Sequence, residues 1–227
     1  MKPEIYPDKQ VQAERLARAV VIALSNTIEA KGRAVLAVPG GTTPGPFLEA
    51  LSREKLAWDR VTVLPTDERC VAEMHDRSNA KLIRTAFLQN DSARSYYFSL
   101  TPLDNETPDD AARRLSKAVA EVAPVDVVVL GMGADMHTAS LFPGADGLEA
   151  ALASGADPVM AITAPGAPEP RLTLSAPVLQ TATHIHLLIT GAEKRAALEL
   201  AQALPVTDAP VRAILDAPAG VTVHYTD

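Results

Sequence analysis

Residues 34–53 read AVLAVPGGTTPGPFLEALSR and hold the pattern from which the rest of the fold can be worked out. The run AVLAV is apolar at every position, which is typical of a strand buried on both faces of a sheet. A turn with paired glycines, Gly40 and Gly41, follows it, and residues 45–53 predict a helix. A buried strand, a glycine turn and a helix in this order indicate an α/β fold with a parallel sheet.

The same alternation of strand and helix continues along the chain. Further short apolar runs predict strands at 61–64, 125–130, 158–162, 185–189 and 221–225. Helices are predicted at 11–30, 78–88, 109–121 and 192–203. The sequence therefore predicts one domain over residues 1–227, with a mainly parallel sheet and helices on both faces. In such sheets ligands bind beyond the carboxyl ends of the strands.

The composition limits the classes of function. The chain has 28 acidic residues against 21 Lys and Arg, and its formal net charge of −7 disfavours binding to nucleic acid or anionic membranes. No apolar run approaches the roughly 20 residues of a membrane span, and the first residues lack the apolar stretch of a signal peptide. A single cysteine excludes an internal disulfide. We expect a cytoplasmic globular protein in which any anion site depends on locally gathered cations.

The glycine turn after residue 38 is a candidate phosphate site. Gly40 and Gly41 let the backbone approach a ligand closely, Thr42 and Thr43 carry hydroxyl donors, and the N-terminus of the next helix favours anions. The turn is neither a P-loop nor a dinucleotide fingerprint. An ordinary strand-to-helix turn remains the alternative.

Basic residues follow three of the predicted strands. Arg69 comes after Asp67 and Glu68, and we expect it to hold an anionic group, with one of the two acids orienting it. Arg171 and Lys194 lie after the fourth and fifth strands, so all three cations can converge on one anion pocket. Cys70 follows Arg69, which predicts a lowered thiol pKa, but no histidine base is expected beside it. Residues 76–79 predict a helix cap rather than a ligand contact.

The segment after the third strand is the strongest candidate for catalysis. It reads GMGADMHTASLFPG over residues 131–144, with Asp135 and His137 two positions apart. Histidine is suited to proton transfer near neutral pH, and an adjacent carboxylate can orient it. The other four histidines are interpreted as structural or exposed, and no third ligand supports metal binding by the pair at 184 and 186, so no metal is predicted.

Taken in order, these blocks resemble those of the 6-phosphogluconolactonase family. The resemblance runs from about residue 35 to 200 and is most specific at HTASLFPG, residues 137–144. The Gly-Gly-Thr-Thr-Pro turn is shared with glucosamine-6-phosphate deaminases, whose equivalent loop carries Asn-Glu-Pro where this chain has Leu141-Phe142-Pro143. The resemblance implies a fold like that of the deaminases and of ribose-5-phosphate isomerase. It also implies hydrolysis of 6-phospho-D-glucono-1,5-lactone in the oxidative pentose phosphate pathway, without a cofactor.

On this resemblance we expect His137 to act as a general base that activates water, with Asp135 fixing it and Arg69 or the backbone N–H groups of 131–134 stabilising the oxyanion. The phosphate is expected on Gly40 to Thr43, with Arg171 and Lys194 as cationic partners. The expected ligand is a small phosphosugar lactone, and the expected assembly is a monomer or small homo-oligomer.

One position departs from the family pattern. The loop usually reads Gly-x-Asp-Gly-His, and Met136 stands at its second glycine. If this position needs a positive φ, methionine is strained there by about 1 kcal/mol. Two other functions remain open: a deaminase or isomerase of phosphosugars on the same scaffold, and, because of Met136, a binding module that has lost its chemistry.

Overall fold

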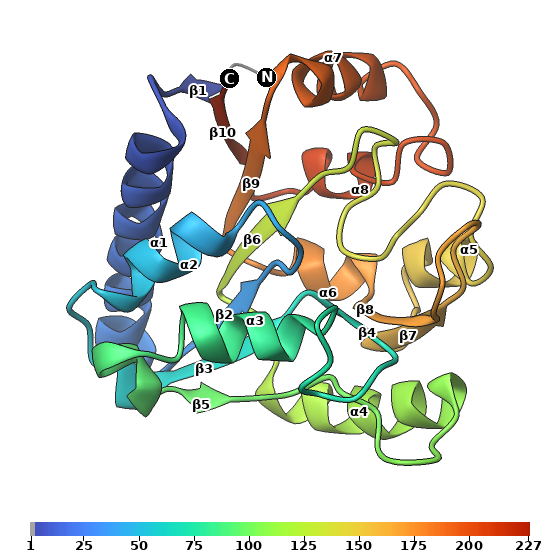
Figure 1. The fold of residues 1–227 in the computed structure, drawn as a ribbon, viewed down its shortest axis with the longest axis horizontal. Coiled ribbons are helices and arrows are strands. Elements are labelled where there is room, and N and C mark those ends of the chain that lie inside the picture. The colour runs from blue at the N-terminus through green and yellow to red at the C-terminus, as the bar shows by residue number, and fades with distance from the viewer. Residues whose placement is uncertain (1–2) are drawn as a thin grey trace.

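The computed structural model describes residues 3–227. Its main sheet has seven strands in the order β1-β10-β9-β6-β2-β3-β5, and every pair of neighbours is parallel (Figure 1). The strands are β1 (Glu4–Ile5), β10 (Thr222–Thr226), β9 (His184–Thr190), β6 (Val127–Gly131), β2 (Ala34–Val38), β3 (Val61–Pro65) and β5 (Tyr96–Tyr97). The predicted α/β architecture is confirmed.

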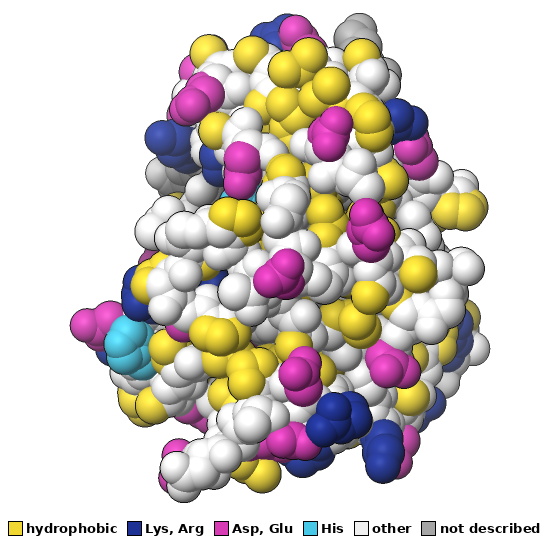
Figure 2. All heavy atoms as spheres, turned by 90° about the vertical axis from the view of Figure 1, so that its right-hand side faces the viewer, with side chains coloured by type: hydrophobic (Ala, Val, Ile, Leu, Met, Phe, Trp, Pro, Cys, Tyr) yellow, Lys and Arg dark blue, Asp and Glu magenta, His cyan; other side chains and the backbone are white. Residues whose placement is uncertain are grey.

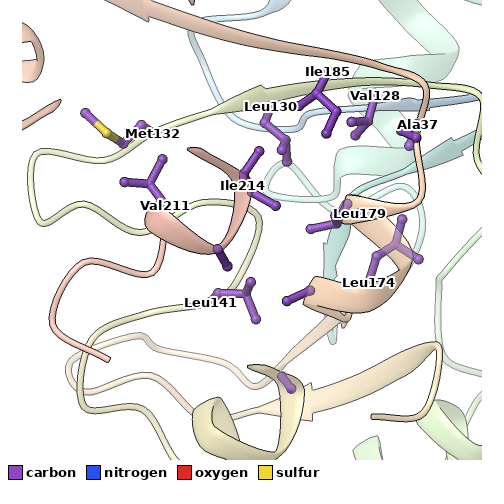
Figure 3. Close-up of a cluster of buried hydrophobic side chains, with 14 of the residues drawn as sticks. Ala37, Val128, Leu130, Met132, Leu141, Leu174, Leu179, Ile185, Val211 and Ile214 are labelled. Carbon is purple, nitrogen blue, oxygen red and sulfur yellow. The ribbon is translucent and has the colours of Figure 1, made fainter. Parts of the chain in front are cut away.

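The continuous apolar runs divide their side chains between two cores. On β2, Val35 and Ala37 belong to one cluster of buried residues, whereas Ala34, Leu36 and Val38 belong to the other. This alternation follows from the two-residue period of a strand, and it explains why a strand covered on both faces has no polar side. Figure 3 shows Ala37, with side chains of β6 and β9, in the first of these cores.

Helices cover both faces, as predicted. One face carries α1 (Lys9–Lys31), α2 (Gly45–Ser52) and α3 (Asn79–Ala86). The other is covered by α4 (Pro108–Val122), α5 (Leu148–Leu152), α6 (Ala176–Gln180), α7 (Ala192–Ala201) and α8 (Arg212–Leu215). Two short 3₁₀ helices, Trp58–Arg60 and Asn90–Arg94, complete the helical elements of residues 3–227. None of the helices in this range is long and apolar enough to cross a membrane.

The longest helix, α1, has both of its ends fixed by local sequence. The Asp8 side chain accepts a hydrogen bond from Val11 N at 2.8 Å and caps the N-terminus. Gly32, with φ of 79°, forms a left-handed C-cap at the other end, a conformation that glycine adopts readily.

The prediction for residues 158–162 was wrong in one respect. This strand, β7 (Val159–Ile162), pairs antiparallel with β8 (Arg171–Leu174), which pairs antiparallel with β4 (Asp67–Arg69), in a separate sheet. The short connection between β7 and β8 has no room for the helical crossover that a parallel pair requires. The small sheet matters for function because it places Arg69 and Arg171 next to each other.

The surface agrees with the net acidic charge. Figure 2 shows the right-hand side of the molecule as drawn in Figure 1, where acidic side chains stand singly across the face and basic ones lie mainly near its edges. The hydrophobic side chains on this face are interrupted by polar ones.

Candidate active site

A pocket of about 210 Å³ lies where β2, β3, β6 and β9 end, at the edge of the sheet that the topology predicts. Eight of the nine predicted site residues line it: Gly40, Gly41, Thr42, Thr43, Arg69, His137, Arg171 and Lys194. The ninth, Asp135, is not part of the pocket wall and contacts His137 instead.

Asp135 and His137 form a hydrogen-bonded pair. His137 Nδ1 lies 2.5 Å from Asp135 Oδ1, and the imidazole is 29% exposed. Partial burial raises the pKa of Asp135, but the hydrogen bond and the charge of His137 outweigh it and hold this pKa below its usual value. The carboxylate therefore stays ionised and fixes the ring through Nδ1, which leaves Nε2 for another partner.

Gly133 makes room for this pair. A Cβ at this position would lie 2.3 Å from both Asp135 Oδ1 and His137 Nδ1, well inside van der Waals contact. The loop is closed by two backbone hydrogen bonds of 3.0 Å, from Gly133 N to His137 O and from Met136 N to Gly133 O. Glycine is therefore required at position 133 because any larger side chain would collide with those of Asp135 and His137.

Met136 has a φ of 66°, in the left-handed region that favours glycine. The expectation that this position needs a positive φ is confirmed, and the strain amounts to about 1 kcal/mol. Met136 O accepts a hydrogen bond from Val211 N at 3.0 Å, and its side chain packs against the core, so both contacts help to hold the strained residue in place.

The segment that follows His137 is held in place by the buried side chain of Leu141 and by hydrogen bonds of Ser140. Leu141 is fully buried and belongs to the same core cluster as Val211 and Ile214 (Figure 3). Ser140 Oγ donates to Asp67 Oδ2 at 2.6 Å, and Ser140 N donates to Thr173 Oγ1 at 3.2 Å. These contacts tie the loop of His137 to the small sheet.

The ring of Phe142 contacts both the candidate base, His137, and one of the candidate anion-binding cations, Arg171. Its centroid is 4.2 Å from that of His137, and the guanidinium carbon of Arg171 lies 5.8 Å from the same ring. A cation at this distance from an aromatic centroid is attracted by the ring quadrupole. Phe142 therefore contacts both the imidazole of His137 and the guanidinium of Arg171.

The glycine turn presents free backbone donors. Gly41 has a φ of 89° and donates its N–H to Asn79 Oδ1 at 3.3 Å. The N–H groups of Thr42 and Thr43 donate to no other residue within 3–227. These two N–H groups stand at the entrance to α2, where an anion is favoured.

Arg69 and Arg171 lie opposite each other on β4 and β8, and Lys194 reaches the same pocket from the first turn of α7. Burial, followed by the nearby charge of Arg69, lowers the pKa of Arg171. Arg69 Nη1 donates to Arg77 O, but the Nε atoms of both facing arginines are buried without a partner in the described part of the chain. Three cations around one pocket in a net acidic protein make a local anion site.

The acids beside Arg69 do not orient its guanidinium, which corrects the prediction. Glu68 accepts hydrogen bonds from Asn79 N at 2.8 Å and Ala80 N at 2.7 Å, so it caps α3. Burial raises the pKa of Glu68, and these backbone donors oppose the rise. Asp67 is instead the acceptor for Ser140.

The expectation of a lowered thiol pKa at Cys70 was also wrong. Burial, followed by the charge of Glu68, raises this pKa to about 11, and Arg171 only partly offsets the rise. A thiol in this state is a poor nucleophile at neutral pH.

The remaining histidines lie away from the pocket wall. His184 is exposed, whereas His186 and His224 are buried and lie 3.0 Å apart, from Nδ1 to Nε2. His75 Nδ1 accepts from Arg77 N at 3.1 Å in an exposed loop. Within residues 3–227, no three His, Cys, Asp or Glu side chains are grouped to hold a metal ion.

Asn79 and Phe142 are among the wall residues that were not predicted as site residues. Asn79 was interpreted as part of a helix cap and of one family block, and Phe142 as part of the family motif, but neither was assigned a role in the site, and both line the pocket. Nothing in the local pattern around Asn79 signals this position, because its partners come from other strands. The aromatic residue in LFP, two positions after Ser140, was a signal that could have been followed.

Comparison with known proteins agrees with the geometry. The family model described as glucosamine-6-phosphate isomerases/6-phosphogluconolactonase matches residues 7–224. The 6-phosphogluconolactonase of Mesorhizobium japonicum is 44% identical over 216 residues, which cover 93% of this chain and 89% of that protein. The crystal structure of a 6-phosphogluconolactonase from Shewanella baltica superposes with a TM-score of 0.94 at 31% identity, covering 99% of this chain and 97% of that one.

A more distant likeness bears on the fold alone. A monomeric glucosamine-6-phosphate deaminase shares the architecture with a TM-score of 0.79 at 22% identity, over 100% of this chain and 97% of its own. The match of the family model over nearly the whole chain, together with the identity to the Mesorhizobium protein, decides the assignment. The chain belongs to the glucosamine-6-phosphate isomerase/6-phosphogluconolactonase family.

Proposed function

We propose that this protein hydrolyses 6-phospho-D-glucono-1,5-lactone to 6-phosphogluconate. The observation that carries the proposal is the hydrogen-bonded pair of Asp135 and His137 in a pocket with three cations. The relatives named 6-phosphogluconolactonase support the same substrate. The Leu141-Phe142-Pro143 sequence favours the lactonase over the deaminase branch of the family.

The proton transfers follow from the tautomer of His137. Because Asp135 Oδ1 is ionised, it accepts a hydrogen bond from a protonated Nδ1. The unprotonated nitrogen, which can act as the base, is then Nε2. Nε2 takes a proton from water while the water oxygen bonds to C1 of the lactone. The bond between C1 and the ring oxygen then breaks, and the imidazolium returns its proton to that oxygen. Asp135 remains ionised throughout and stabilises the imidazolium.

The charges divide between the two ends of the substrate. The 6-phosphate accepts hydrogen bonds from the turn of Gly40 to Thr43, with Arg171 and Lys194 as cationic partners. Arg69, or backbone N–H groups of 131–134, stabilises the charge that develops on the carbonyl oxygen. Every group in this scheme is a side chain or backbone group of the chain itself.

We propose further that residues 1–227 work as a single domain. The large sheet supplies the glycine turn and His137, and the small sheet supplies Arg69 and Arg171. A boundary between the two sheets would divide the pocket.

The direct test generates 6-phosphogluconolactone in situ and follows its loss with purified protein and in buffer alone. Decay well above the spontaneous rate supports the proposal. A rate equal to that of buffer contradicts it. In that case, ammonia release from glucosamine 6-phosphate would identify a deaminase, and binding of 6-phosphogluconate without turnover would identify a binding module.

A further inference from the structure

We propose that Asn79 is a positioning residue that fixes the glycine turn for phosphate binding. The inference rests on the proposed function, in which this turn receives the substrate phosphate. Asn79 is the first residue of α3 and lies 38 positions from the turn in sequence, yet its side chain is 1% exposed in the wall of the same pocket.

The amide of Asn79 joins two strand ends. Nδ2 donates to Asp67 O at 2.8 Å, at the start of β4, and Oδ1 accepts from Gly41 N at 3.3 Å, after β2. Asp67 O is only an acceptor and Gly41 N is only a donor, so the partners determine the orientation of the amide. A carboxylate lacks the donor for Asp67 O, and an alanine lacks both groups.

The turn is shaped to receive this amide. A Cβ on Gly40 would lie 1.9 Å from both Cγ and Oδ1 of Asn79 and 2.1 Å from Nδ2. The amide thus occupies the space in which any other residue at 40 would place its side chain. Gly40 and Asn79 form one packing unit, and this contact explains why the first glycine of the turn is needed even though its φ is not positive.

The position of the amide decides which donors remain for a ligand. The Gly41 N–H is used by Asn79, whereas those of Thr42 and Thr43 have no partner within the described residues. Asn79 is in turn held by Glu68, whose Oε1 accepts from Asn79 N at 2.8 Å. The turn is therefore fixed at Gly41, and the two following N–H groups are left to the phosphate.

The test compares Asn79→Ala and Asn79→Asp with Asn26→Ala, an exposed asparagine on α1. Inorganic phosphate is the probe, measured both by calorimetric binding and as an inhibitor of lactone hydrolysis. We expect Asn79→Ala to weaken phosphate binding and raise KM by about tenfold, with kcat changed by less than about threefold, because a ground-state contact is lost. Asn79→Asp should weaken phosphate binding further, since it adds a negative charge beside the turn. Asn26→Ala should match wild type.

A second pair of variants separates positioning from general loss of stability. Gly40→Ala should weaken phosphate binding strongly in the wild-type background, because its Cβ meets the amide. In the Asn79→Ala background the same change should have little further effect, since the space is then empty. Thermal melts identify any variant that fails to fold.

Unchanged phosphate affinity in both Asn79 variants would overturn the inference, as would equal effects of Gly40→Ala in the two backgrounds. A fall in kcat with KM and phosphate affinity intact would overturn it too. The calorimetric measurement of phosphate binding does not depend on turnover. Failure of lactone hydrolysis in the wild type would therefore contradict the proposed function, and the role of Asn79 would still be decided by calorimetry.

Discussion

Arg69 and Arg171 lie directly opposite each other on antiparallel strands, and both face a pocket that also holds Lys194. Like charges in this arrangement destabilise a sheet. The neighbouring acids only partly compensate, because Glu68 caps α3 and Asp67 bonds Ser140. An anionic ligand explains this arrangement, because an anion between the two guanidinium groups would be attracted by both and would offset their mutual repulsion.

An anion should therefore stabilise the protein through this pair. We predict that inorganic phosphate raises the melting temperature of the wild type, and that Arg171→Gln removes most of this gain and raises KM for the lactone by about 10–100-fold. Arg33→Gln, an exposed arginine without an ion pair in the described chain, is the control. An equal response of both variants to phosphate would show that the effect is one of net charge.

Gly133→Ala should uncouple Asp135 from His137. The new Cβ would lie 2.3 Å from atoms of both side chains, so the pair must separate. We expect kcat to fall by about 10–100-fold, which is less than for removal of His137, because the imidazole remains but is no longer held by Asp135. The matched control is Gly155→Ala, where a Cβ meets nothing within 4 Å. Normal kcat in Gly133→Ala would mean that the contact between Asp135 and His137 is dispensable.

Backbone strain at Met136 can be tested by comparing the stability of its glycine and alanine variants. In most positions alanine is more stable than glycine by roughly 0.5–1 kcal/mol. At a φ of 66° the order should reverse, with Met136→Gly more stable than Met136→Ala by about 1 kcal/mol. Both variants lose the same packing, so chemical unfolding of the two isolates the backbone. The usual order would exclude strain at this position.

The buried pair of His186 and His224 should make the protein sensitive to acid. Burial, then the charges of neighbouring histidines, lowers the pKa of His186 to about 3, and burial lowers that of His224 to about 4, against a weak opposing effect of Glu4. A lowered folded-state pKa means that the unfolded chain binds protons first. Stability from the neutral pair is complete above about pH 6.5 and is lost as the pH falls toward 4.

The loss can be measured by denaturant unfolding between pH 7 and 4. The slope of the free energy of unfolding against pH depends on how many more protons the unfolded chain binds. For this pair the difference is two protons at most, which corresponds to about 2.7 kcal/mol per pH unit. His186→Phe should reduce the slope, whereas His184→Gln, at an exposed position, should leave it unchanged. The same slope in all three proteins would place the acid sensitivity elsewhere.

The sequence predicted the parts of the fold that depend on local pattern. Strands β2, β3, β6, β9 and β10 of the large sheet were predicted from their apolar runs, and the loop of Asp135 and His137 was predicted from its glycines. The two-residue edge strands β1 and β5 are too short for any period to be visible. Strands β4 and β8 were missed because their polar residues face a pocket and their pairing joins segments about 100 residues apart.

The candidate site divides in the same way. Residues beside a strand end, such as Arg69 and Lys194, could be placed at one edge by topology alone. The partners of Glu68 and the bridging contact of Asn79 could not, since each depends on where a separate segment comes to lie. Met136 is intermediate, because the glycine at this position of the family pattern indicated a positive φ.

The most direct test of the account is the rate of 6-phosphogluconolactone loss with wild type, His137→Ala, His184→Ala and buffer in parallel. We predict fast decay with wild type and with the exposed-histidine control, and a kcat lower by about 10²–10⁴ for His137→Ala. A His137→Ala variant that keeps nearly full kcat would contradict the role of the Asp135–His137 pair, however well the wild type performs.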